Sequence, residues 1–514
     1  MASSDVLIVG AGHNGLVAAV VLARAGLSVK VLEAAAVAGG ACRTEYPFSK
    51  APNVGQSTGA YLLGLMPPEL MEELCISLPL VRRDPHYFLP TTGDRYLLSG
   101  SDADATRDQL TAMFSKADAR ANDALREELA RLREDIAPTW LRAPLSIEDT
   151  AERYVRPALR QVFVELCRGS VGTYLRRFGF QSEILEAMYA VTDGFTGLCG
   201  AWDTPGSGMN FLVHNMCRLP GSDGTWMIVR GGMGSVTEAL VDAARRAGAE
   251  IELDAPVSRI EVESGTVHGV VTGDGGLHRA SVVVVGADPF RLRVMLDDAC
   301  PSELSDRIES YRRPGTTMKV NLCLHDLPKF SCLPEPRGQH GATIHLLPEE
   351  DTLARLRRAF ADCREGRLPE TPSIEWYIHT TLDPSLRDAQ GRHSAALFVQ
   401  WVPYALAQGS WETETDRYVR SLLALCDRFA PGTSELVVDA FVLTPPKIES
   451  HFGLTAGHIH HVDNSFGFAD RLPYSLGVAG LYACGAGCHP AGSVIGAAGY
   501  NAAKVVLTDL AISS

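Results

Sequence analysis

A glycine-rich turn between two valine-rich runs constrains this chain more than any other feature. The stretch VLIVGAGHNG places Gly10, Gly12 and Gly15 in the spacing G-x-G-x-x-G, directly after a short apolar run. The first glycine allows a tight turn, the second lets backbone approach a pyrophosphate, and the third lets a helix pack closely on a strand. A helix over 13–26 and a strand over 28–32 follow, so a βαβ unit in a parallel sheet is predicted.

Glu33 ends the second strand, where a carboxylate accepts hydrogen bonds from ribose hydroxyls. The pyrophosphate of a bound dinucleotide would lie at the positive N-terminus of the helix. An acid at this position disfavours a 2′-phosphate, so NADP is not expected. FAD and NAD both remain open on this motif alone.

Three further segments are informative: AVAGGACRT (36–44), APVSRIEV (255–262) and GLYACGAGCHPAGSVIGAAGYNAA (480–503). They resemble segments of a large flavoprotein group that includes amine oxidases and phytoene desaturases. The resemblance implies noncovalently bound FAD in place of NAD. A plain glycine turn with a surface arginine is the alternative for the first segment.

The resemblance also implies roles for individual residues along the cofactor. The loop with Gly39 and Gly40 would lie along the FAD pyrophosphate, and Arg43 would reach a phosphate. The backbone of Val257 would contact adenine. Near the C-terminus the turn at Gly485 precedes a helix whose first N–H groups would face the isoalloxazine, and these belong to Val494, Ile495 and Gly496.

The remainder of the chain resembles one group of phytoene-desaturase-related FAD proteins. TPGSGMNFLVHNM, GTWMIVRGGMG, TIHLLPEEDTL and LTPPKIESHFGLTAGHIHH carry this likeness, which covers nearly the whole chain. It implies an α/β fold in which a Rossmann-like FAD-binding domain holds an inserted α+β substrate domain. The expected segments are 1–75 (FAD-binding), 76–223 (substrate domain, mainly helical), 224–310 (FAD-binding), 311–465 (substrate domain, mixed sheet) and 466–514 (FAD-binding).

Two residues are candidates for chemistry. Lys319 falls on a strand where amine oxidases of the resembling fold place a lysine that holds water against flavin N5, although a solvated strand lysine is the simpler interpretation. His489 follows the C-terminal glycine turn and can meet the flavin ring or the substrate, or cap the helix. The HIHH stretch is interpreted as a strand, in which His458 and His460 share a face and His461 points away. A metal site is therefore not expected.

The favoured function is hydride abstraction from, or isomerisation of, an apolar and unsaturated carotenoid-like or lipid-like molecule, as the resemblance implies. Residues 150–215 hold few acids that would neutralise a substrate ammonium, which favours a polyene over an amine. An FAD-dependent amine oxidase that uses oxygen is the first alternative. A flavoprotein with a mainly binding or regulatory role is the second.

Composition limits the partners. The formal net charge is −14 and no basic stripe is present, so nucleic acid is not an expected partner. The twelve cysteines form no C-x-x-C, which argues against a redox disulfide and suits a reducing compartment. No room for a leader precedes the first strand, so a cytoplasmic protein is expected, with a mitochondrial location as the alternative that the resemblance implies. Peripheral membrane contact is compatible with an apolar substrate, and no oligomeric state is predicted.

Overall fold

The computed structural model describes residues 4–512. A five-stranded sheet in strand order β19-β13-β1-β2-β9 carries the glycine-rich turn, and all neighbouring strands in it run parallel. The prediction of a Rossmann-like α/β fold is therefore confirmed. The central strands are buried along their whole length. The strands are β1 (Val6–Val9), β2 (Val29–Leu32), β9 (Glu250–Glu252), β13 (Val282–Val285) and β19 (Leu481–Ala483).

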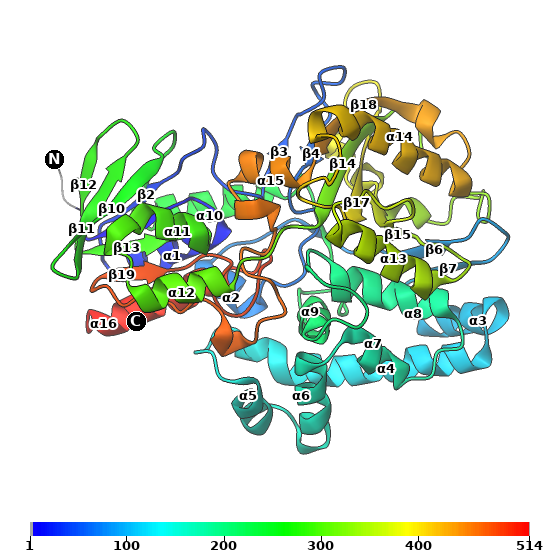
Figure 1. The fold of residues 1–514 in the computed structure, drawn as a ribbon, viewed down its shortest axis with the longest axis horizontal. Coiled ribbons are helices and arrows are strands. Elements are labelled where there is room, and N and C mark those ends of the chain that lie inside the picture. The colour runs from blue at the N-terminus through cyan, green and yellow to red at the C-terminus, as the bar shows by residue number, and fades with distance from the viewer. Residues whose placement is uncertain (1–3, 513–514) are drawn as a thin grey trace.

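Three helices pack together on this sheet. Helix α1 (His13–Arg24) contacts both α10 (Gly234–Arg246) and α16 (Ala497–Asp509), so segments from both ends of the chain and its middle meet here (Figure 1). Glycines make the approach possible. A Cβ at Gly15 would overlap the carbonyl oxygen of Gly10, and one at Gly499 would overlap that of Asn14.

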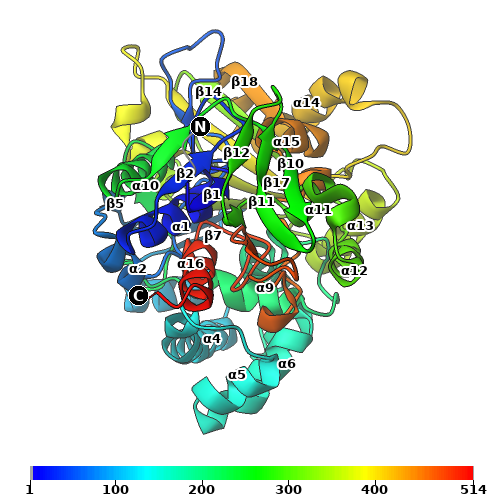
Figure 2. The same cartoon turned by 90° about the vertical axis from the view of Figure 1, so that its left-hand side faces the viewer.

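A smaller antiparallel sheet, β10-β11-β12, packs beside β13 and stands out at the front of the turned view (Figure 2). Two helices follow β13 in the chain and cover this side. The elements are β10 (Val257–Glu263), β11 (Thr266–Thr272), β12 (Leu277–Arg279), α11 (Pro289–Leu296) and α12 (Ser302–Ser310).

A mixed seven-stranded sheet forms the second lobe, in the order β18-β14-β17-β16-β15-β6-β7. Strands β14 and β17 are the second and third strands of this sheet, pair antiparallel and are buried at every residue. The strands are β6 (Tyr87–Pro90), β7 (Tyr96–Ser99), β14 (Thr317–Leu324), β15 (Thr343–Leu346), β16 (Ser373–Tyr377), β17 (His393–Gln400) and β18 (Val437–Leu443). Helices α13 (Thr352–Arg364), α14 (Trp411–Phe429) and α15 (Pro445–Phe452) accompany them.

A helical layer lies under this sheet (Figure 1). Its longest helix, α4 (Lys116–Ile136), buries Leu125, Leu129, Leu132 and Ile136 at the three- and four-residue spacing of one helix face. The others are α3 (Ala103–Met113), α5 (Ile147–Tyr154), α6 (Arg160–Arg168), α7 (Val171–Arg176), α8 (Glu183–Tyr189) and α9 (Ser207–His214).

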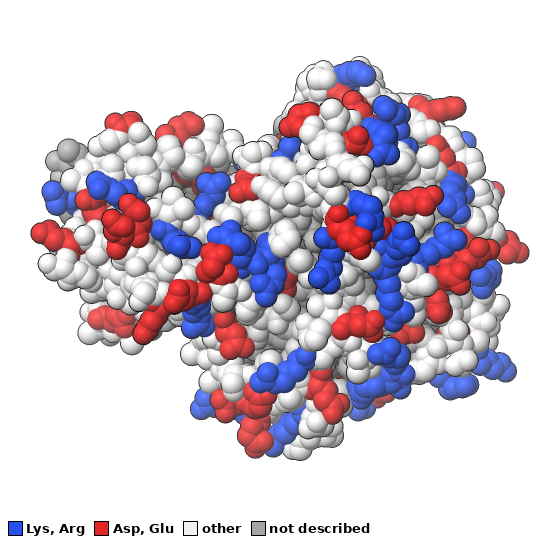
Figure 3. All heavy atoms as spheres, viewed as in Figure 1, with Lys and Arg blue, Asp and Glu red and all other residues white. Residues whose placement is uncertain are grey.

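The remaining elements join the lobes: α2 (Pro68–Leu74), the two-stranded pair β3 (Thr44–Glu45) and β4 (Gln56–Ser57), and the pair β5 (Leu80–Val81) and β8 (Ile228–Val229). The strands of the parallel sheet lie within 1–75, 224–310 and 466–514, and those of the mixed sheet within 76–223 and 311–465. Basic and acidic side chains alternate over the face in Figure 3. Within residues 4–512, no helix is long and apolar enough to cross a membrane.

Candidate functional site

A large cavity begins where the central strands of the parallel sheet end. Its volume is about 1480 Å³, and Gly10, Glu33 and Gly286, which follow β1, β2 and β13, line it. It continues to the mixed sheet, where Lys319 of β14 and Glu375 of β16 belong to the wall. Ligands of open α/β folds bind outside the carboxyl ends of the strands. The cavity therefore suits a dinucleotide with a second molecule beyond it.

The three glycines of the first turn have three different local geometries. Gly10 has φ +97°, which favours glycine. Gly12 has φ −66°, lines the cavity, and a Cβ there would meet no atom within 4 Å. The N–H groups of the first helical turn of α1 have no partner within the helix and are available to an anion. The backbone at Gly12 is thus open to a ligand, whereas Gly15 serves helix–strand packing.

Glu33 and the second glycine loop lie next to this turn. The Glu33 carboxylate accepts hydrogen bonds from the Ala11 N–H (2.7 Å) and the Ala35 N–H (2.9 Å), which fixes its position on the cavity wall. Gly39 (φ +118°) and Gly40 (φ +59°) line the cavity as well. The structure therefore brings together on one cavity wall the first six cofactor residues expected from the sequence.

Arg43 lies beside the cavity and does not form its wall. Its Nη2 is 3.3 Å from Glu45 Oε1 and 2.9 Å from His451 Nε2, and the guanidinium lies 5.1 Å from the centre of the Phe452 ring. Phe452 does line the cavity. Contact between Arg43 and a phosphate stays a prediction.

The other expected cofactor residues divide into two groups. Val257 and Val494 line the cavity, as does Ser493. Gly485, Ile495 and Gly496 do not: Gly485 lies behind the wall, where a Cβ would be 2.8 Å from the Gly286 carbonyl oxygen, and Ile495 is buried in the helical core. Gly496 has φ +82° and is the N-cap residue directly before α16.

Lys319 is 5% exposed and lies in an aromatic recess. Its Nζ is 4.1 Å from the centre of the Tyr61 ring and 4.6 Å from that of Phe398, and both rings line the cavity. Burial lowers the pKa of Lys319 to about 7. The alternative of a solvated strand lysine is wrong, because β14 is buried on both faces.

Two carboxyl groups in the cavity wall escaped the sequence analysis. Burial raises the pKa of Glu375 to about 7, and Tyr377 and Thr196 donate hydrogen bonds to it. Burial also raises the pKa of Asp193 to about 7, and Asn215 Nδ2 donates to it at 3.0 Å. Glu375 had one sequence signal, an acid within the apolar strand SIEWY. Asp193 belongs to the segment that seemed poor in acids, so that argument against amines is weakened.

Arg83 is a third residue of the cavity wall that was not predicted from the sequence. It is 2% exposed and lines the same cavity. Its Nε donates to the Trp226 carbonyl oxygen (3.0 Å) and its Nη1 to Thr343 Oγ1 (2.6 Å). No motif marked it, because its neighbours come from distant parts of the chain.

His489 does not reach the cavity. Its side chain is buried, packs edge-on against Phe468 with ring centres 5.2 Å apart, and has no hydrogen-bond partner for either ring nitrogen among residues 4–512. Burial lowers its pKa to about 3, so the ring is neutral at pH 7. This position does not bring the imidazole into contact with a substrate.

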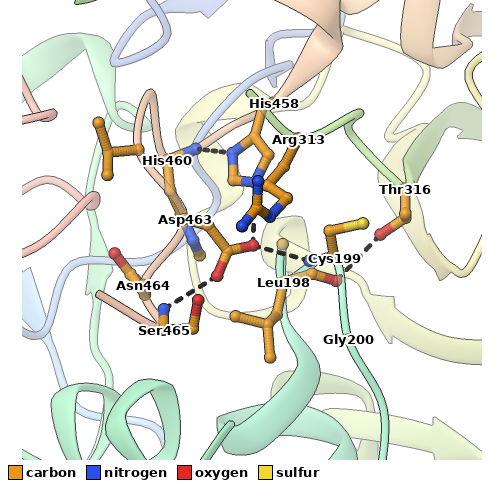
Figure 4. Close-up of polar contacts among 12 residues, drawn as sticks. Leu198, Cys199, Gly200, Arg313, Thr316, His458, His460, Asp463, Asn464 and Ser465 are labelled. Atoms are coloured by element: carbon orange, nitrogen blue, oxygen red, sulfur yellow. Dashed lines mark hydrogen bonds and ion pairs between the residues drawn. The ribbon is translucent and has the colours of Figure 1, made fainter. Parts of the chain in front are cut away.

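The HIHH stretch is a loop, so its interpretation as a strand is wrong. His460 and His461 both line the cavity, with His461 at φ +60°. His458 turns away and contacts Asp463, with Nε2 3.2 Å from Oδ2 (Figure 4). Asp463 also accepts hydrogen bonds from the Cys199 and Ser465 N–H groups, both at 2.9 Å. These contacts of Asp463 join the loop to the turn at 198–200. They also keep His460 and His461 at the cavity wall.

Most aromatic side chains in the helical segment 189–226 pack in or against the helical core and do not line the cavity. Trp226 lines the cavity, whereas Tyr189, Phe195 and Phe211 belong to the helical core. No group of three or more His, Cys, Asp or Glu side chains suited to a metal ion exists in the part of the chain that the structure describes. All twelve cysteines are free.

Comparisons with known proteins identify a family model, related sequences and a solved structure of the same fold. A family model described as flavin containing amine oxidoreductase matches residues 15–365. Pyridine nucleotide-disulfide oxidoreductase domain-containing protein 2 of Mus musculus is 34% identical over 98% of this chain and 94% of its own length. Hydroxyneurosporene desaturase of Cereibacter sphaeroides is 27% identical over 99% of this chain and 98% of its own. The structure of cyclohexylamine oxidase from Brevibacterium oxydans superposes with a TM-score of 0.59 at 19% identity, covering 99% of this chain and 100% of that one.

We call the turn at Gly10–Gly15 the glycine cradle. The geometry at Gly12 gives a direct test of whether this cradle holds a pyrophosphate. Gly12→Ala should fold normally, because φ is −66° and a Cβ meets no protein atom, yet it should lose most of its bound FAD, because the Cβ would stand where backbone must approach the pyrophosphate. Flavin content per chain, measured by absorbance, checks this. Gly15→Ala is the contrasting variant and should lower the melting temperature, since its Cβ would overlap Gly10. Full FAD content in Gly12→Ala would contradict the cradle.

Proposed function

The chain belongs to the flavin-containing amine oxidoreductase family, and from this membership we propose that it is an FAD-dependent oxidoreductase that removes hydride from carbon in an unsaturated small molecule. Bound flavin supplies the hydride acceptor of this chemistry. The observation that supports the proposal most strongly is the recess of Lys319, Tyr61 and Phe398 at the end of the cavity that begins at the glycine cradle.

Residues on the cavity wall match the individual parts of an FAD molecule. Gly10, Gly12 and the first turn of α1 would hold the pyrophosphate, Glu33 the ribose hydroxyls, and Val257 the adenine. Ser493 and Val494 would lie at the isoalloxazine. Noncovalent attachment is part of the proposal, because Cys484 and Cys488 are buried and neither belongs to the cavity wall.

The aromatic recess would position the reacting carbon. Tyr61 and Phe398 offer flat apolar surfaces, and Ile459 and Leu62 extend them within the cavity. Burying such surface contributes about 25 cal/mol per Å². The desaturase among the relatives has an unsaturated compound in its name, and an aromatic-walled recess suits a conjugated substrate. Arg83, Asp193 and Glu375 belong to the same cavity wall and favour a substrate with a polar end over a pure hydrocarbon.

Amine oxidation is the second candidate, and a specific observation favours it. Glu375 and Asp193 lie in the same cavity as the aromatic recess, and a carboxylate stabilises an ammonium ion. Burial raises the pKa of both to about 7, so each is only partly ionised at neutral pH. Their attraction for a cation is weakened accordingly, which places this candidate second.

A panel of substrates under anaerobic conditions separates the candidates. We expect conjugated alcohols and acids to reduce the flavin, seen as loss of its visible absorbance, and benzylamine and cyclohexylamine to leave it oxidised. Reduction by amines alone would establish the amine oxidase and contradict the proposal. A flavin that every compound leaves oxidised would favour a binding or regulatory role.

Lys319 gives a second test. A positive charge beside the flavin favours reaction with oxygen, so Lys319→Met should slow reoxidation of the reduced protein about 10- to 100-fold, the size expected for a lost charged hydrogen bond. Since burial lowers the pKa of Lys319 to about 7, the ammonium form predominates below that pH. The wild-type rate should therefore fall as pH rises through about 7, and the variant should lose this dependence.

FAD content should stay unchanged in Lys319→Met. Lys319 lies on β14 of the mixed sheet, whereas the glycine cradle follows β1 of the parallel sheet. Lys30→Met is the matched control: Lys30 pairs with Glu250 and Glu252 at the sheet edge and does not line the cavity. A wild-type rate and pH profile in Lys319→Met would remove Lys319 from the reaction.

A further inference from the structure

Arg83 is a buried cation without a counter-ion. Its side chain donates two hydrogen bonds, to the Trp226 carbonyl and to Thr343 Oγ1. A guanidinium has five N–H groups, so three remain without a protein partner. No carboxylate among residues 4–512 lies within 4 Å of it. A buried charge left unpaired is costly, which points to a partner that the chain does not supply.

A second buried arginine has protein hydrogen-bond partners for all five of its N–H groups. Arg471 is 1% exposed and donates to four carbonyl oxygens and to the side chain of Asn464. It lies off the cavity and ties the loop after His461 to the turn before α16. Arg83, in contrast, is under-satisfied and opens on the cavity. The contrast separates a structural arginine from one available to a ligand.

The groups around Arg83 do not neutralise it. Burial, and then the positive charge of Arg83, lower the pKa of His86, His345 and His379 to about 3, so these rings are neutral at pH 7. Glu375 is engaged by Tyr377 and Thr196, and its pKa is raised by burial. Asp193 and Glu375 are only partly ionised at pH 7, because burial raises the pKa of each to about 7, so neither fully offsets the charge of Arg83.

We propose that Arg83 binds a carboxylate of the substrate, within the cavity that also contains the recess of Lys319, Tyr61 and Phe398. This inference rests on the proposed function and narrows its substrate to an unsaturated carboxylic acid. The two oxygens of a carboxylate match the fork of a guanidinium, and such charge-assisted pairs are stronger than neutral hydrogen bonds. The unsaturated carbon of the same molecule would lie against the aromatic rings.

A matched pair of probes tests the anion site without turnover. Sorbate and 2,4-hexadien-1-ol share a carbon skeleton and differ in the charged end. Titration of the reduced holoenzyme under anaerobic conditions, in which the flavin cannot accept a hydride, gives a Kd for each from the flavin difference spectrum. We expect sorbate to bind about 10-fold tighter or more, as one charge-assisted pair predicts. Equal affinity, or tighter binding of hexyl phosphate than of sorbate, would overturn the assignment.

Variants of Arg83 test whether this residue causes the tighter binding of sorbate than of 2,4-hexadien-1-ol. Arg83→Gln should bind both probes equally, and Arg83→Lys, which keeps the charge without the fork, should retain part of the preference. Arg133→Gln is the control, because Arg133 is a part-buried arginine on α4 whose side chain donates to the Asn215 carbonyl and does not line the cavity. It should keep the wild-type ratio. A preference that survives in Arg83→Gln would overturn the role of Arg83.

The two proposals fail separately. Tight sorbate binding with a flavin that no unsaturated compound reduces would contradict the reaction and leave the anion site standing. Reduction by conjugated alcohols with no preference for sorbate would contradict the anion site and leave the reaction standing. If Arg83→Gln fails to fold, the wild-type comparison of the two probes still decides.

Discussion

The close approach of α1 to the end of β1 is the constraint on which the site depends. Gly15 permits it, because any side chain there would overlap the Gly10 carbonyl. On the other side of α1, Gly499 lets α16 approach the backbone of Asn14. The N-terminal turn of α1 is thereby fixed between the parallel sheet and the C-terminal helix. Its free N–H groups and the wall at Ser493 and Val494 consequently face one cavity, although they lie far apart in the sequence.

The sequence allowed prediction of those parts of the site whose geometry is local. Gly10, Gly12 and Gly15 imply a strand, a turn and a helix within one short segment, and Glu33 follows from the next strand. The role of Lys319 was predicted from the resemblance to amine oxidases. Its burial could not be predicted from TTMKVNLCL, because burial depends on what covers both faces of the sheet. His489 was misjudged for the same reason: a residue that follows a glycine turn can point into the core as easily as into a cavity.

Long-range contacts explain the remaining differences. HIHH has the spacing of a strand, but Asp463 accepts hydrogen bonds from Cys199 and Ser465 and holds His458 in a loop instead. Arg83, Asp193 and Glu375 belong to three separate segments that meet only after the two lobes assemble. No local pattern connects them.

Buried charge determines the chemical character of the cavity. Burial lowers the pKa of Lys319 and raises those of Glu375 and Asp193, so all three titrate close to neutrality. Arg83 stays cationic and leaves three of its five N–H groups without a protein partner among the described residues. An anionic substrate end would complete the set of interactions, while the aromatic recess receives the apolar part.

A crystal structure of the purified holoenzyme tests the central claim most directly. We expect density for one FAD per chain, with its pyrophosphate at Gly12 and its isoalloxazine between Val494 and Lys319. A dinucleotide bound elsewhere, or a ring remote from Lys319, would contradict it.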